Sequence, residues 1–261
     1  VLVVQSGNVL FSHTYRLGSL RLLETLEKFD APPGKQRAIM ESQIQRVVAQ
    51  IREHVSNDTP LEMVAIGGDV RSAIGLGRRF DFDEKHARHV ATLCRKLFAD
   101  LQSEHQLEPR LELVLYVAAL LHEIGMYINA RSNHKHAMYL IRHSELFGLS
   151  RKDVLLVSLV ARYHRRSSPM PDHEGYSILD RDQRVAVSKL AAILRLAIAL
   201  DDSRSQRIND IQCRSDTKRM VLIAKGVEDV SLEQLALRQS GNLFEETFGV
   251  PVQIRPTRRP S

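Results

Sequence analysis

The sequence predicts an α+β protein of several domains, with an all-helical middle between two mixed regions. The chain begins with short β-rich runs separated by a glycine-containing turn. From Phe80 onward apolar residues recur at helical spacing and end in the almost wholly apolar run LAAILRLAIAL, which indicates a helix buried on all sides. After Arg207 the period shortens again. We therefore expect domains over residues 1–74, 75–207 and 208–261.

The first region alternates strands and helices. Its expected elements are strands over 1–4, 9–15 and 61–66, a turn at 6–8, and helices from Leu17 and over 34–55. The last strand runs into Gly67 and Gly68, and two glycines before a helix allow backbone N–H groups to approach a phosphate closely. The same pattern fits an ordinary strand-to-helix turn, and Asp69 would repel a phosphate unless a metal lay between them.

The other two regions have clear start and stop signals. Asp83 is placed to cap one helix, while Pro109 and Gly125 begin and end another. Further helices are expected over 134–145, 150–163, 180–202 and 232–239, a helical turn over 243–248, and strands over 208–214, 220–224 and 250–254. The apolar positions that we expect to be buried include Leu120, Leu121, Leu194, Leu196 and Leu200.

Composition restricts the location and the partners. The two cysteines, Cys94 and Cys213, form neither a metal-binding spacing nor a disulfide framework, so we expect a reducing cytoplasm. No apolar run approaches a membrane span, and the first residues lack the basic start of a signal peptide. Because the chain begins within a β-rich run, we expect a fragment. The net charge of +6 favours anionic partners, although many basic proteins bind none.

Histidines and carboxylates gather at the expected helix ends. The candidate metal ligands are His86, His122, Glu123, His164 and Asp201. Imidazoles and carboxylates from several packed helices can surround a divalent metal, which would acidify a bound water. Each residue could equally be an ordinary polar helix-end residue.

Arginines form a second cluster, near the ends of the helices expected over 150–163 and 180–202. The members are Arg162, Arg165, Arg166, Arg204 and Arg207. Guanidinium groups bind phosphates in pairs of hydrogen bonds, so the cluster is a candidate polyanion site. Alternatively, these cations only complement the helix dipoles.

Several segments resemble the exopolyphosphatase and guanosine-pentaphosphate phosphohydrolase family. LLHEIGMYIN, NHKHAMYLI, LVARYHRR and ILRLAIALDDSRSQRI are similar to its HD-like helical domain, and LFEETFGVPVQI looks like its small C-terminal α/β domain. VLVVQSGNVLFSHTYRLGSLRL and VAIGGDVR resemble stretches of its actin-like (ribonuclease H-like) second lobe.

The resemblance implies a function and its site. Family members hydrolyse terminal phosphates of inorganic polyphosphate or guanosine pentaphosphate (pppGpp) with Mg²⁺, in a cleft between two actin-like lobes, and are usually homodimers. It therefore implies phosphate binding at Gly67, Gly68 and Arg21, catalytic residues upstream of Val1, and neither a membrane nor a specific nucleic acid as partner. The His122-Glu123 pair is usual in this family and is associated with a helical site that no longer catalyses. In such a site we expect the carboxylates to pair with Arg88 or Arg195.

The chain departs from the family pattern at three points. It lacks the first lobe with its DxGGGS-type loop, Asp69 stands where a small hydroxyl residue is usual, and we expect a missing segment at Ile74–Gly75. Three functions remain open: a polyphosphate or pppGpp phosphatase of which this is a part, an independent metal-dependent HD phosphohydrolase, and a non-catalytic module for polyanion binding or dimerisation.

Overall fold

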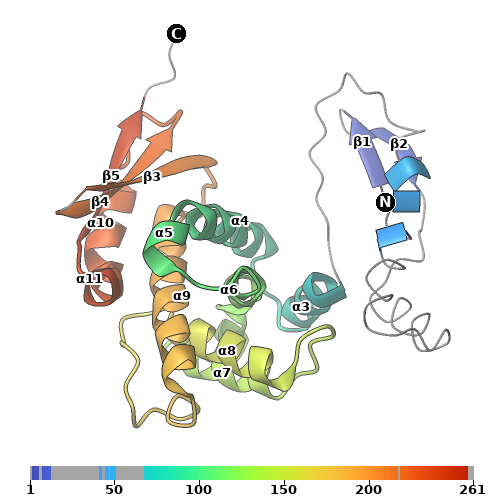
Figure 1. The fold of residues 1–261 in the computed structure, drawn as a ribbon, viewed down its shortest axis with the longest axis horizontal. Helices are drawn as coiled ribbons and strands as arrows, with labels where there is room; N and C mark the ends of the chain where they lie inside the picture. The colour runs from blue at the N-terminus through green and yellow to red at the C-terminus, as the bar shows by residue number, and fades with distance from the viewer. Residues whose placement is uncertain are drawn as a thin grey trace. The chain divides into compact units, whose positions relative to one another are not determined.

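The structure is a computed structural model of the chain, and it divides into two compact units, Val1–Gly68 and Asp69–Ser261. Each unit is described by itself (Figure 1). The residues that the structure describes are 2–5, 8–12, 41–42, 45–46, 48–50, 68–216 and 218–257.

The described part of the first unit contains a β-hairpin. Strands β1 (Leu2–Gln5) and β2 (Asn8–Ser12) pair antiparallel, with Leu2 opposite Ser12 and an irregularity between Val3 and Val4. The antiparallel pairing agrees with the predicted pair of β-rich runs, while residues 6 and 7 of the predicted turn lie outside the described residues. Helical residues within 41–50 lie inside the helix predicted over 34–55. The strand predicted over 61–66, together with Arg21 and Gly67, lies outside the described residues.

Helix α3 (Gly68–Arg79) crosses the position where a missing segment was predicted. Its backbone is a continuous helix through Ile74 and Gly75, so the structure has no spatial break at that position. Val70, Ala73 and Ile74 recur on one helix face and are buried in the core of the second unit. The compact helical unit thus begins at Asp69, before the predicted boundary at residue 75.

The helical region follows the predicted order. Its elements are α4 (Glu84–Asp100), α5 (Gln102–His105), α6 (Leu111–Leu121), the 3₁₀ helix η1 (Ile124–Tyr127), α7 (Asn133–Arg142), α8 (Arg151–Arg162) and α9 (Arg181–Leu200). The Asp83 side chain accepts a hydrogen bond from His86 N and so caps α4 as predicted. Reciprocal side-chain caps start α8 at Ser150 and α9 at Asp180.

Helix α9 is the centre of the second unit. It packs against α4, α6 and α8, and also against the two C-terminal helices (Figure 1). Its apolar run is therefore covered by several elements, which explains why it lacks a polar face. The five leucines predicted to be buried are buried: Leu120, Leu121, Leu194, Leu196 and Leu200.

The C-terminal region forms a small three-stranded sheet with two helices. Its elements are β3 (Asp210–Asp216), β4 (Arg219–Lys225), α10 (Ser231–Ser240), α11 (Asn242–Phe248) and β5 (Val252–Thr257). Central strand β4 pairs antiparallel with β3 and parallel with β5, so α10 and α11 form the crossover between parallel strands. Both helices pack on α9 and β3 contacts α4, so the sheet belongs to the same compact unit as the helices. The predicted boundary at 207–208 therefore marks a change of secondary structure within that unit.

The second unit is mostly helical with this one small sheet. Among the described residues, no helix combines the length and the apolar character that crossing a membrane requires.

Candidate functional site

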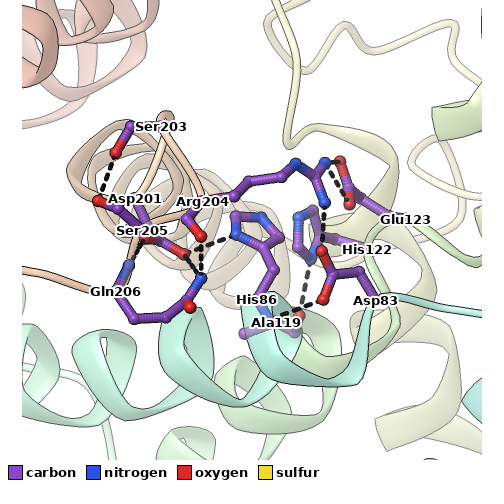
Figure 2. A network of polar contacts seen from close by, with 10 residues as sticks. All are labelled: Asp83, His86, Ala119, His122, Glu123, Asp201, Ser203, Arg204, Ser205 and Gln206. Carbon is purple, nitrogen blue, oxygen red and sulfur yellow. Dashed lines mark hydrogen bonds and ion pairs between the residues drawn. The ribbon is translucent and has the colours of Figure 1, made fainter.

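Helix ends bring the predicted histidines and carboxylates together. His86 lies in the first turn of α4, His122 and Glu123 follow α6, and Asp201 ends α9 (Figure 2). The rings of His86 and His122 lie 5.6 Å apart between centroids, and those of His122 and His164 lie 5.2 Å apart. All five predicted ligand residues thus converge, because the helices that carry them pack side by side.

Each imidazole is held through its Nδ1 atom. His86 Nδ1 donates to Asp201 Oδ2 over 2.8 Å, and His122 Nδ1 donates to the Ala119 carbonyl over 2.7 Å. His164 Nδ1 donates to the Ala161 carbonyl over 2.6 Å. In a neutral imidazole held in this way the proton lies on Nδ1, and Nε2 is the atom that can accept a proton or bind a metal.

Burial keeps two of these rings neutral. It lowers the pKa of His122 to about 4, and it lowers the pKa of His164 well below the usual histidine value. The neighbouring His122 and Arg165 also lower the pKa of His164, whereas the hydrogen bond to the Ala161 carbonyl opposes them. Neutral imidazoles at neutral pH are the form that a metal requires.

Three of the five residues form the tightest group. One ligand atom each from His86, His122 and Glu123 lie within 4.8 Å of one another. Asp201 acts through His86, and it also accepts hydrogen bonds from Gln206 N and Nε2. Asp201 therefore orients the His86 ring. His164 lies beside the group, with its ring against that of His122.

Arg204 binds the carboxylate of this group. Its Nη2 atom donates to both oxygens of Glu123, at 2.7 and 2.8 Å, and its Nη1 atom donates to Asp83 Oδ2 at 3.0 Å (Figure 2). Burial, the largest single effect, acts to raise the pKa of Glu123, but His122 and Arg204 outweigh it, so the pKa is lowered. Glu123 is therefore an ionised carboxylate with a cationic partner.

Arg88 and Arg195, the arginines predicted to pair with the carboxylates of an inactive site, have other partners. A pair of this kind does exist, between Arg204 and Glu123. Arg88 pairs with Glu84 on its own helix. Arg195 is buried and donates to the carbonyls of Tyr163 and Ser167 and to Asn242 Oδ1. It thereby fixes the segment after α8 and the start of α11. The sequence signal that was missed is the position of Arg204, only three residues after Asp201.

The structure divides the predicted arginine cluster. Arg204 and Arg207 are engaged by carboxylates, since Arg207 makes two hydrogen bonds to the fully buried Glu233. Arg165 donates to the backbone carbonyls of Ala130 and Arg131, while Arg162 lies over Tyr163 with its Nη1 atom 3.4 Å from Met138 Sδ. In the described part of the chain, the members without a carboxylate partner are Arg162, Arg165 and Arg166.

Of the predicted phosphate-binding residues, only Gly68 lies in the described part of the chain. It is the first residue of α3, and the half-buried Asp69 follows it in the first turn. The carboxylate of Asp69 would repel a phosphate bound at the start of this helix.

A family comparison agrees with this fold. The model of the family described as "Ppx/GppA phosphatase, domain III" matches residues 70–243, from α3 into the start of α11. The chain belongs to the Ppx/GppA phosphatase family. The mostly helical second unit with its small sheet is consistent with domain III of that family.

Among the curated relatives are proteins named guanosine-5'-triphosphate,3'-diphosphate pyrophosphatase. The protein from Photobacterium profundum is 26% identical over 212 residues, which are 78% of this chain and 39% of that protein. The protein from the El Tor strain of Vibrio cholerae serotype O1 is 28% identical over 181 residues, 67% of this chain and 35% of that protein. The chain thus spans well under half the length of these relatives.

Proposed function

We propose that this chain is part of a hydrolase that releases a terminal phosphate from pppGpp or from inorganic polyphosphate. The observation that carries the proposal is the match of residues 70–243 to a phosphatase family, together with relatives named for a guanosine phosphate substrate. We place the hydrolytic residues outside the described part of the chain. A partial actin-like lobe at residues 1–74, a cytoplasmic location and a homodimer belong to the same proposal.

Mg²⁺ is the metal that this activity implies, and the helical cluster does not suit it. Mg²⁺ prefers an octahedral shell of oxygens and keeps several waters. The cluster offers two imidazole nitrogens and the carboxylate of Glu123, which Arg204 already binds. We therefore assign no step of the hydrolysis to His86, His122 or Glu123, and propose that this region holds the protein together.

The test is phosphate release by the complete natural protein from pppGpp and from long polyphosphate, with and without Mg²⁺. The proposal expects Mg²⁺-dependent release from at least one of the two substrates. Release from neither substrate, at any Mg²⁺ concentration, would refute it. The ratio of the two rates gives the substrate preference.

A second candidate is an independent HD-type phosphohydrolase centred on the helical cluster. It is favoured by the proximity of His86, His122 and Glu123 and by the neutral state of His122. Glu123→Ala separates the two candidates. Our proposal expects lower stability but unchanged release per folded molecule, whereas an HD hydrolase would lose turnover and keep its fold.

A third function, retention of a polyanion, is compatible with the first. Arg165 and Arg166 are exposed, and the ring of His164 just before them contacts that of His122. Several guanidinium groups can bind a polyphosphate through paired hydrogen bonds and release of its counterions. A dimer would bring two such surfaces together and so give a longer binding surface for the polyphosphate chain.

A further inference from the structure

The group formed by His86, His122 and Glu123 has the donor set of a transition-metal site. The Nδ1 atoms of both rings are engaged by oxygen acceptors, so each ring has Nε2 left for a ligand. Metal-binding histidines commonly have this second hydrogen bond, because it fixes the ring and its tautomer. The ligand atoms of all three residues lie within 4.8 Å of one another.

One of these atoms is buried without a partner. His122 is 1% exposed, and its Nε2 atom makes no hydrogen bond. A buried polar atom without a partner is unfavourable, and natural structures contain few of them. Nε2 is the acceptor nitrogen of the ring, so a cation coordinated there would satisfy it.

Arg204 places a positive charge at the third ligand. Both Glu123 oxygens accept from its Nη2 atom, and the guanidinium also bridges to Asp83 (Figure 2). The turn that carries Arg204 has positive φ at Arg204 (54°) and Gln206 (50°), a conformation that is uncommon for residues other than glycine. Asp201 stabilises this turn by accepting from Gln206 N.

We propose that Arg204 is an internal cation that closes a latent transition-metal site formed by His86, His122 and Glu123. A metal ion and the Arg204 guanidinium would compete for the carboxylate of Glu123, and the two cations would repel each other. The metal-bound state and the Arg204-bound state therefore exclude one another. Two imidazoles and one carboxylate suit Zn²⁺ or Mn²⁺ and leave a further coordination position for water.

The Arg204 side chain lies partly in solvent. It is 43% exposed, whereas Glu123 is 22% exposed and His86 only 3% exposed. Removing the guanidinium therefore uncovers a carboxylate beside two buried imidazoles while Asp201 still holds His86. This proposal does not depend on which substrate the complete protein hydrolyses.

The experiment compares Mn²⁺ and Zn²⁺ binding to the complete protein and to its Arg204→Gln variant by isothermal titration calorimetry. We expect Arg204→Gln to bind one additional ion per chain, at least about tenfold more tightly than wild type at that site. Hydrogen bonds to a charged group contribute enough to change an equilibrium constant by roughly that factor. The melting temperature of Arg204→Gln should also rise when the metal is added.

Two further variants serve as controls. Arg88→Gln removes the same charge from α4 but leaves the cluster intact, because Arg88 pairs with Glu84, and it should bind metal like wild type. Adding His122→Asn to Arg204→Gln should abolish the additional ion. Arg204→Lys keeps the positive charge without the guanidinium fork and should give an intermediate affinity, so it provides a second test if Arg204→Gln folds poorly.

Metal binding that is equal in wild type, Arg204→Gln and Arg204→Lys would overturn the proposal. Binding that survives His122→Asn would also overturn it, since the ion would then lie elsewhere. Loss of phosphate release, by contrast, would bear on the proposed function and leave the metal measurement unaffected.

Discussion

His86 donates its Nδ1–H to Asp201 Oδ2 across 2.8 Å and so joins the first turn of α4 to the residue that ends α9. The two side chains are 3% and 1% exposed, and 115 residues separate them in the sequence. The contact therefore depends on the packing of the two helices, and it also fixes the His86 ring, which forms a group with His122 and Glu123.

Asp201→Ala should lower the free energy of unfolding by about 3 kcal/mol, because it leaves His86 Nδ1 and Gln206 N without their acceptor in a buried place. Urea denaturation measures the change. Asp202→Ala is the matched control, since Asp202 is the exposed neighbour, and it should stay within about 0.5 kcal/mol of wild type. Equal effects of the two substitutions would show that the buried contact contributes nothing.

Stability should fall as the pH is lowered from 6.5 to about 4. The folded protein keeps His122 neutral down to a pKa of about 4, whereas the unfolded chain protonates it near 6.5. The unfolded state thus binds more protons across this window, and the loss for His122 is on the order of 3 kcal/mol at the lower end. His164, with its lowered pKa, adds a loss in the same direction.

The measurement for this pH effect is urea denaturation at pH 7 and at pH 5, with His122→Asn as the test variant. Removing the buried imidazole should flatten the pH dependence. The exposed His143 serves as control, and His143→Asn should keep the wild-type slope. An unchanged slope in His122→Asn would contradict the assignment.

Gly125→Ala should destabilise the protein by at least about 3 kcal/mol, because an added Cβ would lie 2.0 Å from the Asn133 carbonyl oxygen and 2.6 Å from Ala137 N. These are backbone atoms of α7, so relief requires that helix to move away from η1. Gly75→Ala is the control: a Cβ there meets nothing within 4 Å, and alanine favours the helical state by up to about 1 kcal/mol. Thermal denaturation should separate the two variants, and a stable Gly125→Ala would contradict the packing.

Binding of long polyphosphate should weaken when Arg165 and Arg166 are both changed to alanine, and it should fall steeply between low and moderate salt. Fluorescence anisotropy with labelled polyphosphate measures both effects. The exposed pair Arg71 and Arg79 on α3 gives a control that loses the same charge. Equal binding by the two double variants, or no dependence on polyphosphate length, would assign Arg165 and Arg166 to ordinary surface.

Local patterns in the sequence determined much of the second unit. Apolar spacing and capping residues predicted the helices α4, α6, α7, α8 and α9 and the burial of their leucines, because helix formation and amphipathicity depend on neighbours a few residues apart. The small sheet and its two helices followed from the same local reasoning. The missing segment predicted at Ile74–Gly75 was inferred from an expected segment length, whereas the residues on either side of that position form one helix.

Only the tertiary structure decided the partners of the charged groups. The residue types of the cluster could be predicted, since His122-Glu123 and Asp201 stand at the ends of apolar helices. That Arg204 turns back to Glu123, and that Arg207 pairs with buried Glu233, depends on a turn with positive φ and on the packing of α10 against α9. A long cationic side chain can reach many acceptors from one sequence position, so the folded arrangement alone selects which carboxylate it binds.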